Sequence, residues 1–363
     1  MSSILMPVLA DIYTQPVQLA DFYVSNITDR KFTAALVKHL NITAPLGSFQ
    51  HLKRVRGDKS KDGQLQILLC PCHHVSKMTK HNGDFVTTSA GHRDFVMIPR
   101  DHDDSVRESE QINIMMTSLL KSSDIPSTTL SKPYLVKVPI CCPATRAQYE
   151  ESSFYWPVTF HEDKRIAQML SGTFFSKEEI QRIKNYLLEA ESLGKKAAEK
   201  GQKHYGIVVV DPDTNTIIAK GHDMCRGSNP LHHAVMVGLD LVARSQGGGM
   251  WCLEDPDMYF RPSEEKSNVC ELTSCESSNG QMASEKSGPY LCTGYDIFLN
   301  MEPCPMCSMA LVHSRVNRVF YSTPHVDGGL GSKYKVHMQA GLNHHFDVFR
   351  WTGEVLSDIR AHH

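Results

Sequence analysis

The feature that most constrains this chain is the run Pro303-Cys304-Pro305-Met306-Cys307, which stands where a helical pattern begins. Two thiolates three residues apart lie side by side on a first helical turn, where the helix dipole favours the deprotonated form that binds zinc. His233, on an earlier predicted helix, supplies an imidazole. The pattern therefore predicts one zinc ion held by His233, Cys304 and Cys307, with the fourth position open.

Other interpretations of these residues exist, because a C-x-x-C pair can also be redox-active or simply buried, and a lone histidine is often structural. The order of the predicted elements favours zinc: helix, hairpin, helix with the histidine, then strand and helix with P-C-x-x-C. His362 and His363 are candidates for the open position that the sequence does not test. The segment Cys70 to His74 is too compressed for a tetrahedral site, so we predict no metal there.

Length and composition indicate an ordinary globular protein with more than one domain. The chain has 363 residues, of which 41% are hydrophobic and 21% charged, with a formal net charge of −2. No apolar run is long enough to span a bilayer, and the first ten residues lack the features of a secretory signal. Eleven cysteines, an odd number, argue against a disulfide framework. We expect no membrane partner and an intracellular protein, in the nucleus, the cytoplasm or both.

Residues 1–150 are predicted to form an α+β domain, followed by a linker over 151–175. The pattern reads β-α-β-β-α-β, the order of a ferredoxin-like unit. The expected elements are a strand within Ile12 to Val24, a helix Thr28 to Leu40, strands Leu52 to Arg56 and Leu65 to Cys70, a helix Val106 to Leu120, and a strand Tyr134 to Val138.

Residues 176–350 are predicted to form a second domain, a three-layer α/β unit, with a tail over 351–363. Ser176 and Glu179 make a capping box that begins a helix. Strands and helices then alternate: strands Gly206 to Val210 and Thr216 to Lys220, helix His232 to Arg244, strand Tyr295 to Asn300, helix Cys304 to Arg315 and strand Val316 to Tyr321. Residues 254–289 have eight acidic, three basic and seven serine residues, and are predicted to be a disordered insertion in which Met258, Tyr259 and Phe260 can dock.

The second domain resembles the cytidine deaminase-like superfamily, and within it the tRNA adenosine deaminase branch. The resemblance rests on the two metal motifs and on further segments in the same order: Asn300 to Cys307, His313 to Val316, Gly329 to Ser332 and Gly341 to His344. It implies an α/β three-layer cytidine deaminase-like fold with one bound Zn²⁺ ion.

One position departs from that family's pattern. Active members have glutamate two residues after the zinc histidine, where it moves protons between the attacking water, the purine ring and the leaving amine. This chain has Val235, which cannot carry a proton. Glu302 precedes the thiolates in active relatives as well, so it does not restore the missing role. We therefore expect no catalytic residue and no activity from this chain alone.

A deaminase-like domain with Val235 behind a long extra domain resembles the non-catalytic subunit of the eukaryotic heterodimeric deaminase that converts wobble adenosine-34 to inosine. The resemblance implies a catalytic deaminase paralogue as partner, the tRNA anticodon arm as the RNA ligand, and a structural role for zinc. Two alternatives stay open. One is an active nucleobase deaminase with a non-standard acid or base, and the other is a zinc-stabilised interaction protein with no RNA role.

RNA binding needs positive charge on the surface, since phosphate contacts supply much of the affinity. Five basic residues cluster in a predicted hairpin, and two more follow Gly331-Ser332. These candidates are Lys53, Arg54, Arg56, Lys59 and Lys61, with Lys333 and Lys335 as a second group and Arg315 and Arg318 beside them. The competing interpretation is an ordinary solvated hairpin tip, because charge runs are usually just surface.

Overall fold

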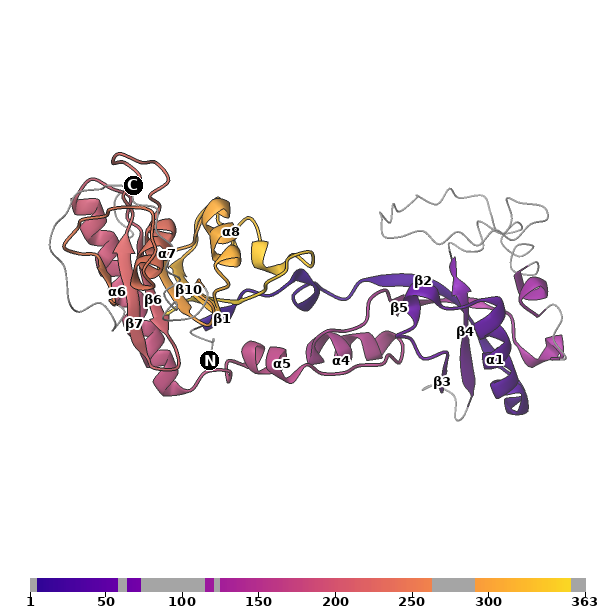
Figure 1. The fold of residues 1–363 in the computed structure, drawn as a ribbon. Helices are drawn as coiled ribbons and strands as arrows, with labels where there is room; N and C mark the ends of the chain where they lie inside the picture. Colours follow the sequence, from indigo (N-terminus) through magenta and orange to yellow (C-terminus); the bar gives the residue numbers. More distant parts are fainter. Residues whose placement is uncertain (1–4, 58–63, 73–114, 121–124, 263–290, 354–363) are drawn as a thin grey trace. The chain divides into compact units, whose positions relative to one another are not determined.

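The computed structural model describes residues 5–57, 64–72, 115–120, 125–262 and 291–353 (Figure 1). The chain divides into two compact units. One, the α+β unit, is Gln15–Asp163, and the other, the α/β unit, combines Met1–Thr14 with Lys164–His363. One boundary between the units therefore lies after residue 163, within the predicted linker. The other lies after residue 14, where the sequence predicted no domain boundary.

The α+β unit has four strands and a long helix in the predicted order. These are β2 (Leu19–Ile27), α1 (Thr33–Thr43), β3 (Val55–Gly57), β4 (Leu65–Pro71) and β5 (Tyr134–Pro139). The sheet order is β3-β4-β2-β5, with every pair antiparallel. This interleaved order is the one expected of a β-α-β-β-α-β unit, since each crossover skips one strand. Residues 115–120 are helical, and the rest of the predicted helix Val106 to Leu120 lies outside the described residues.

Each face of this sheet carries its own apolar cluster. Leu36 and Leu40 of α1 pack with Ile67 and Leu69 on one face. On the other face Trp156 is fully buried among residues that include Phe22, Leu52 and Leu68. Trp156 ends α4 (Arg146–Tyr155), which begins at a capping box between Thr145 and Gln148. The start of the predicted linker is therefore a helix of the α+β unit, because its aromatic residues complete this core.

The α/β unit is built on a seven-stranded mixed sheet of order β1-β11-β10-β9-β6-β7-β8. Its strands are β1 (Leu5–Pro7), β6 (Gly206–Asp211), β7 (Thr216–His222), β8 (Tyr259–Phe260), β9 (Asp296–Met301), β10 (Arg318–Thr323) and β11 (Asp347–Trp351). Strands β9, β10 and β11 are parallel, and the other pairs are antiparallel. The predicted strands Thr216 to Lys220 and Val316 to Tyr321 are shifted by up to two residues.

Helices cover both faces of this sheet, which confirms the three-layer prediction (Figure 1). The helices are α5 (Lys164–Ser171), α6 (Lys177–Glu199), α7 (Ala234–Ser245) and α8 (Pro305–His313). Val208 of β6 packs with the α6 cluster, whereas its neighbour Ile207 packs with α7 and α8, as strand alternation requires. The capping box of Ser176 and Glu179 begins α6 as predicted.

Short 3-10 helices complete the described elements. They are η1 (Asp11–Tyr13), η2 (Arg30–Phe32), η3 (Gly47–Phe49), η4 (Ser127–Thr129) and η6 (Val336–Met338). Among the described helices of the chain, none combines the length and apolar character that crossing a membrane requires.

The amino terminus belongs to the α/β unit, because β1 pairs antiparallel with β11 through Leu5 and Trp351. The first strand was expected within Ile12 to Val24. It is found as β2, which begins at Leu19 and extends to Ile27, while residues 11–13 form η1; the sequence did not predict β1. A three-residue strand whose partner lies at the other end of the chain leaves no local signal, so periodicity could not detect it.

The first residues of the predicted insertion 254–289 are part of the fold. Tyr259 and Phe260 form β8 and pair with Lys220 and Ala219 of β7. The expectation that this segment docks locally is therefore confirmed, and the disorder predicted from residue 254 is corrected for 254–262, where the aromatic pair extends the sheet. Residues 263–290 lie outside the described part of the chain.

Candidate metal centre

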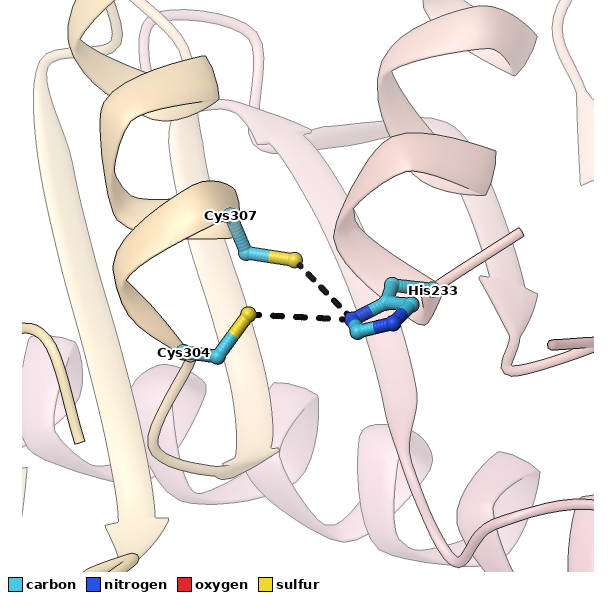
Figure 2. Close-up of side chains that lie close together, drawn as sticks. All are labelled: His233, Cys304 and Cys307. Atoms are coloured by element: carbon cyan, nitrogen blue, oxygen red, sulfur yellow. Dashed lines mark hydrogen bonds between the residues drawn. The ribbon is translucent and has the colours of Figure 1, made fainter. Parts of the chain in front are cut away.

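The three predicted ligands lie together where two helices begin. His233 is the residue before α7, Cys304 is the residue before α8, and Cys307 lies in the first turn of α8. Nδ1 of His233 is 3.7 Å from Sγ of Cys304 and 3.6 Å from Sγ of Cys307 (Figure 2). All three donor atoms lie within 4.8 Å of one another. The structure thus brings together residues that are 71 or more positions apart in the sequence.

These distances fit a zinc ion. Typical Zn–S and Zn–N bonds of about 2.3 Å and 2.0–2.1 Å, at a tetrahedral angle, separate nitrogen from sulfur by about 3.5–3.6 Å. A soft N and S₂ donor set is also the chemistry that zinc prefers. His233, Cys304 and Cys307 would hold the ion, and it would tie the start of α7 to the start of α8.

Local sequence explains why the donors are placed so well. Pro305 occupies the first turn of α8, where its fixed φ favours a helix start and no amide hydrogen is needed. The pKa of the Cys304 thiol is lowered to about 5, first by the hydrogen bond from the Cys307 thiol and then by the Cys307 backbone N–H and His233. The pKa of Cys307 is raised because Cys307 keeps the proton that the two sulfurs share. One thiolate is therefore available at neutral pH before any metal binds.

Val235 lies in the wall of a cavity of about 120 Å³ that the ligands also line. Its side chain is only 4% exposed and belongs to the core cluster between the sheet, α7 and α8. The other lining residues are Lys203, Tyr205, Gly206, Asp223, Ala234, Leu299, Met301, Glu302, Pro303 and His325. An apolar group thus occupies the position two residues after the histidine, where the sequence comparison expects the proton carrier.

Glu302 lines the same cavity, but its carboxylate is committed to the backbone. It accepts hydrogen bonds from the N–H groups of His325 at 3.1 Å, Leu330 at 3.1 Å and Ser332 at 2.9 Å, and from the Ser332 hydroxyl. The residue is 2% exposed. A carboxylate with so many donors is an anchor for residues 325–332, in agreement with the expectation that Glu302 does not replace the missing glutamate.

Asp223 is a cavity residue that the sequence reasoning missed. It is fully buried, and Oδ1 accepts a hydrogen bond from the backbone N–H of Cys225 at 3.1 Å. Oδ2 is also buried and has no hydrogen-bond partner among the described residues. The one signal in the sequence is its place directly after β7, a strand end beside the helix that follows the histidine.

The basic residues predicted for RNA binding have different environments. The prediction for Arg54 is wrong, because its guanidinium is buried and donates to backbone carbonyls of Leu40, Ala44, Leu68 and Leu69. Burial lowers the pKa of Arg54 to about 10. This side chain joins α1 to β4 and is not presented to a ligand.

Arg56 is also used within the α+β unit. It donates to Gln66 and to the carbonyl of Tyr155, and its guanidinium carbon lies 4.0 Å from the centroid of the Trp156 ring. Lys53 is exposed, as predicted. Lys59 and Lys61 lie outside the described residues. The hairpin thus contributes fewer surface charges than its sequence suggests, since two of its arginines pack inward.

The second basic group is partly neutralised by aspartates. Lys333 pairs with Asp327 at 2.6 Å, and Lys335 pairs with Asp11 at 2.6 Å while donating to the carbonyl of Leu9. Lys335 therefore helps to hold the amino-terminal segment. Arg318, a further candidate, forms an ion pair with Asp296.

Two other clusters of ligand-type residues have structural explanations. Cys70 is buried against Met115, and burial raises the pKa of its thiol to about 12. His73, His74, His362 and His363 lie outside the described residues. His222, Asp255 and Asp257 also gather, but Lys196 and Lys200 already bind both carboxylates at 2.6 to 2.7 Å, which leaves little net charge for a cation.

Comparison with known proteins agrees with both units. Residues 180–323 match the cytidine and deoxycytidylate deaminase zinc-binding region, and residues 20–93 match the tRNA-specific adenosine deaminase TAD3 N-terminal domain. The second match includes strands β2 to β4. The first includes His233, Cys304 and Cys307, and thereby identifies the α/β unit as a zinc-binding deaminase-like domain.

Full-length relatives extend the comparison to almost the whole chain. The probable inactive tRNA-specific adenosine deaminase-like protein 3 of Danio rerio is 37% identical over 348 residues, covering 95% of this chain and 90% of that protein. The human protein of the same name is 36% identical, with 95% and 88% covered. The tRNA-specific adenosine deaminase subunit TAD3 of Saccharomyces cerevisiae is 26% identical, with 85% and 76% covered. The chain therefore belongs to the family of tRNA-specific adenosine deaminase-like protein 3.

Proposed function

We propose that this chain is the non-catalytic, zinc-binding subunit of a heterodimeric tRNA deaminase that converts wobble adenosine-34 to inosine, acting in the nucleus, the cytoplasm or both. The observation that carries the proposal is the cavity beside His233, Cys304 and Cys307, where Val235 supplies an apolar wall. The three residues proposed as metal ligands lie together, and Val235 stands at the position that the resemblance assigns to the proton carrier. The names of the full-length relatives support this reading.

In this proposal one zinc ion has a structural role. The ion would be held by one residue before α7 and two at the start of α8, and would stabilise the contact between these helices. Two neighbouring residues stabilise the same region without metal. Glu302 holds residues 325–332 by hydrogen bonds, and Val235 packs in the apolar core.

The surface proposed for the catalytic subunit lies on α8. Met306 and Met309 are 39% and 37% exposed, and residues three apart lie on one face of a helix. Exposed methionines provide adaptable apolar contacts at protein interfaces. A Met309→Glu substitution should weaken copurification of the two subunits, whereas Met250→Glu, at an 84% exposed position elsewhere, should not.

The test of the proposed function is inosine formation at position 34 of a tRNA that has adenosine there. This chain alone, the catalytic paralogue alone and the coexpressed pair are compared. Activity from the pair only is expected, because this chain lacks the proton carrier and the partner supplies it. Activity from this chain alone would overturn the proposal.

Asp223 supports a second candidate function, that of an active deaminase with a non-standard base, because the residue lines the cavity and its Oδ2 has no hydrogen-bond partner among the described residues. Under this alternative the isolated chain is active, and Asp223→Asn would abolish that activity. Under our proposal the pair that carries Asp223→Asn keeps the rate of its chemical step. Val235→Glu restores a carboxylate near the ligands and is the substitution that we expect to favour activity of the isolated chain.

A further inference from the structure

A groove on the α+β unit lies apart from the candidate metal centre and includes one of the predicted RNA-binding residues, Lys53. It has a volume of about 390 Å³ and combines aromatic, basic and backbone-fixed residues. The lining residues are Lys53, Arg146, Tyr149, Val158, Thr159, Phe160, His161 and Glu162. The sequence placed most of them in a linker, so no function was expected of them.

The walls of this groove are held by regular contacts. Leu52 and Val158 form a β-bridge, Lys53 donates its N–H to the carbonyl of Pro157 at 2.9 Å, and Thr159 donates to His51 at 2.8 Å. The opposite wall is the first half of α4, which the capping box of Thr145 fixes at its start. The backbone that forms the groove is therefore a preformed feature of the unit.

A pair of stacked rings forms the centre of the groove. Tyr149 of α4 and Phe160 have centroids 5.0 Å apart and an interplanar angle of 16°. The guanidinium carbon of Arg146 lies 5.5 Å from the Phe160 centroid and 5.9 Å from that of Tyr149. Both rings are only half-buried. Aromatic rings and guanidinium planes arranged in this way are the groups on which unpaired RNA bases stack.

Basic groups border the rings. Lys53 is exposed, and its ammonium group has no ion pair within the described part of the chain. Arg146 pairs with Glu162 at 3.3 Å, and both side chains are well exposed, at 57% and 36%. An exposed pair of this kind contributes little, so a phosphate can replace the carboxylate without a large loss.

We propose that this groove binds one unpaired nucleotide of the tRNA, with the base stacked on an outer face of the Tyr149–Phe160 pair and the phosphate held by Lys53 and Arg146. The inference rests on the proposed function and names a contact site for the same RNA. An unpaired nucleotide fits because bases inside an A-form helix do not present their faces to side chains. A nucleotide has both a base and a phosphate, so a nucleotide site would account for aromatic rings and basic side chains lining the same groove.

The test measures the affinity of the full-length chain, coexpressed with its catalytic subunit, for a tRNA with adenosine-34 at several salt concentrations. Tyr149→Leu keeps apolar bulk but removes the ring, and should weaken binding about tenfold with an unchanged salt dependence. Lys53→Gln should weaken binding and lower the slope of log affinity against log salt by about one. The matched control is Lys38→Gln, an exposed lysine on α1, which packs on the other face of the sheet.

Tyr149→Phe keeps the ring and should bind as the wild type does, which separates stacking from any effect on folding. Thermal melting shows whether Tyr149→Leu is folded, and Lys53→Gln remains decisive if it is not. Wild-type affinity for tRNA in both Lys53→Gln and folded Tyr149→Leu would overturn the proposal that the groove binds a nucleotide. If the wild-type pair still forms inosine, the proposed function is unaffected by that result. A wild-type pair that forms no inosine would overturn the proposed function instead.

Discussion

The carboxylate of Glu302 lies directly against the backbone of Gly328, so closely that a Cβ atom built on this glycine would be 2.1 Å from the carboxylate carbon. The space is closed because Glu302 also binds the N–H groups of residues on both sides of the glycine. The glycine and the buried acid therefore form one unit at the edge of the metal cavity.

Gly328→Ala should destabilise the protein by about 2 to 3 kcal/mol, because the added methyl group displaces Glu302 from its donors. In a Glu302→Ala background the same substitution should cost less than about 1 kcal/mol, since the space is open. Urea unfolding of the two single variants and the double variant measures this coupling. Additive costs would contradict the contact.

Cys307→Ser should remove the metal and lower the melting temperature. The variant loses one of three protein ligands, and structural zinc contributes directly to folding. Metal analysis of the purified chain should give about one zinc in the wild type and much less in the variant, and a chelator should lower only the wild-type melting temperature. Cys252→Ser, at an exposed cysteine, is the control and should keep its zinc.

Arg54→Gln should cost about 3 to 5 kcal/mol of stability, because buried carbonyls at the end of α1 and in β4 lose the hydrogen bonds that the Arg54 guanidinium donates. The adjacent Lys53→Gln should change stability by less than about 0.5 kcal/mol, since Lys53 is exposed. Urea midpoints of the two variants make the comparison. A stable Arg54→Gln protein would mean that these hydrogen bonds do not hold the helix to the sheet.

Acid should destabilise the α/β unit through His337. Burial, with Lys335 and His345 nearby, lowers the pKa of His337 to about 4, against the opposing effects of the Val8 carbonyl and Glu302. The unfolded chain takes up this proton near pH 6.5, so stability is complete above pH 6.5 and falls as the pH drops toward 4. At pH 5 the loss is about 2 kcal/mol.

His337→Gln keeps a donor for the carbonyl of Val8 but cannot titrate. Its melting temperature should therefore fall less than that of the wild type between pH 7.5 and pH 5. Equal pH dependence of the two proteins would show that His337 is not responsible.

The sequence predicted the helices and strands that have a local hydrophobic period, and it predicted the motifs whose residue types suit metal binding. The apolar face of α6 and the alternation within β6 leave signals within a few residues, and both predictions are confirmed by the elements found. His233, Cys304 and Cys307 lie together as expected, and zinc binding by them stays a prediction. The metal ligands could be paired across the chain only because a resemblance supplied the order of motifs. Periodicity alone would have left His233 as one histidine among many.

The failures are residues whose role is set by distant neighbours. Arg54 is a basic residue next to the exposed Lys53, and nothing in the local sequence distinguishes the two. Arg54 is buried because its guanidinium donates to carbonyls at the end of α1 and in β4. Asp223 is an ordinary acid after a strand until the fold places it beside the metal ligands. Phe160 lies three residues after Pro157 in a stretch without periodicity, and its partner Tyr149 lies on a helix that the sequence did not predict.

Because β1 pairs with β11, the α/β unit is discontinuous in sequence, and the α+β unit is an insertion between its two segments. On the ribosome, residues 15–163 can fold as soon as they emerge, but Leu5–Pro7 must wait unpaired until Asp347–Trp351 has been synthesised. A fragment that begins at residue 164 would lack this edge strand and expose β11 to pairing with other chains. The seven-stranded sheet can thus gain its β1 edge only after β11 has been synthesised.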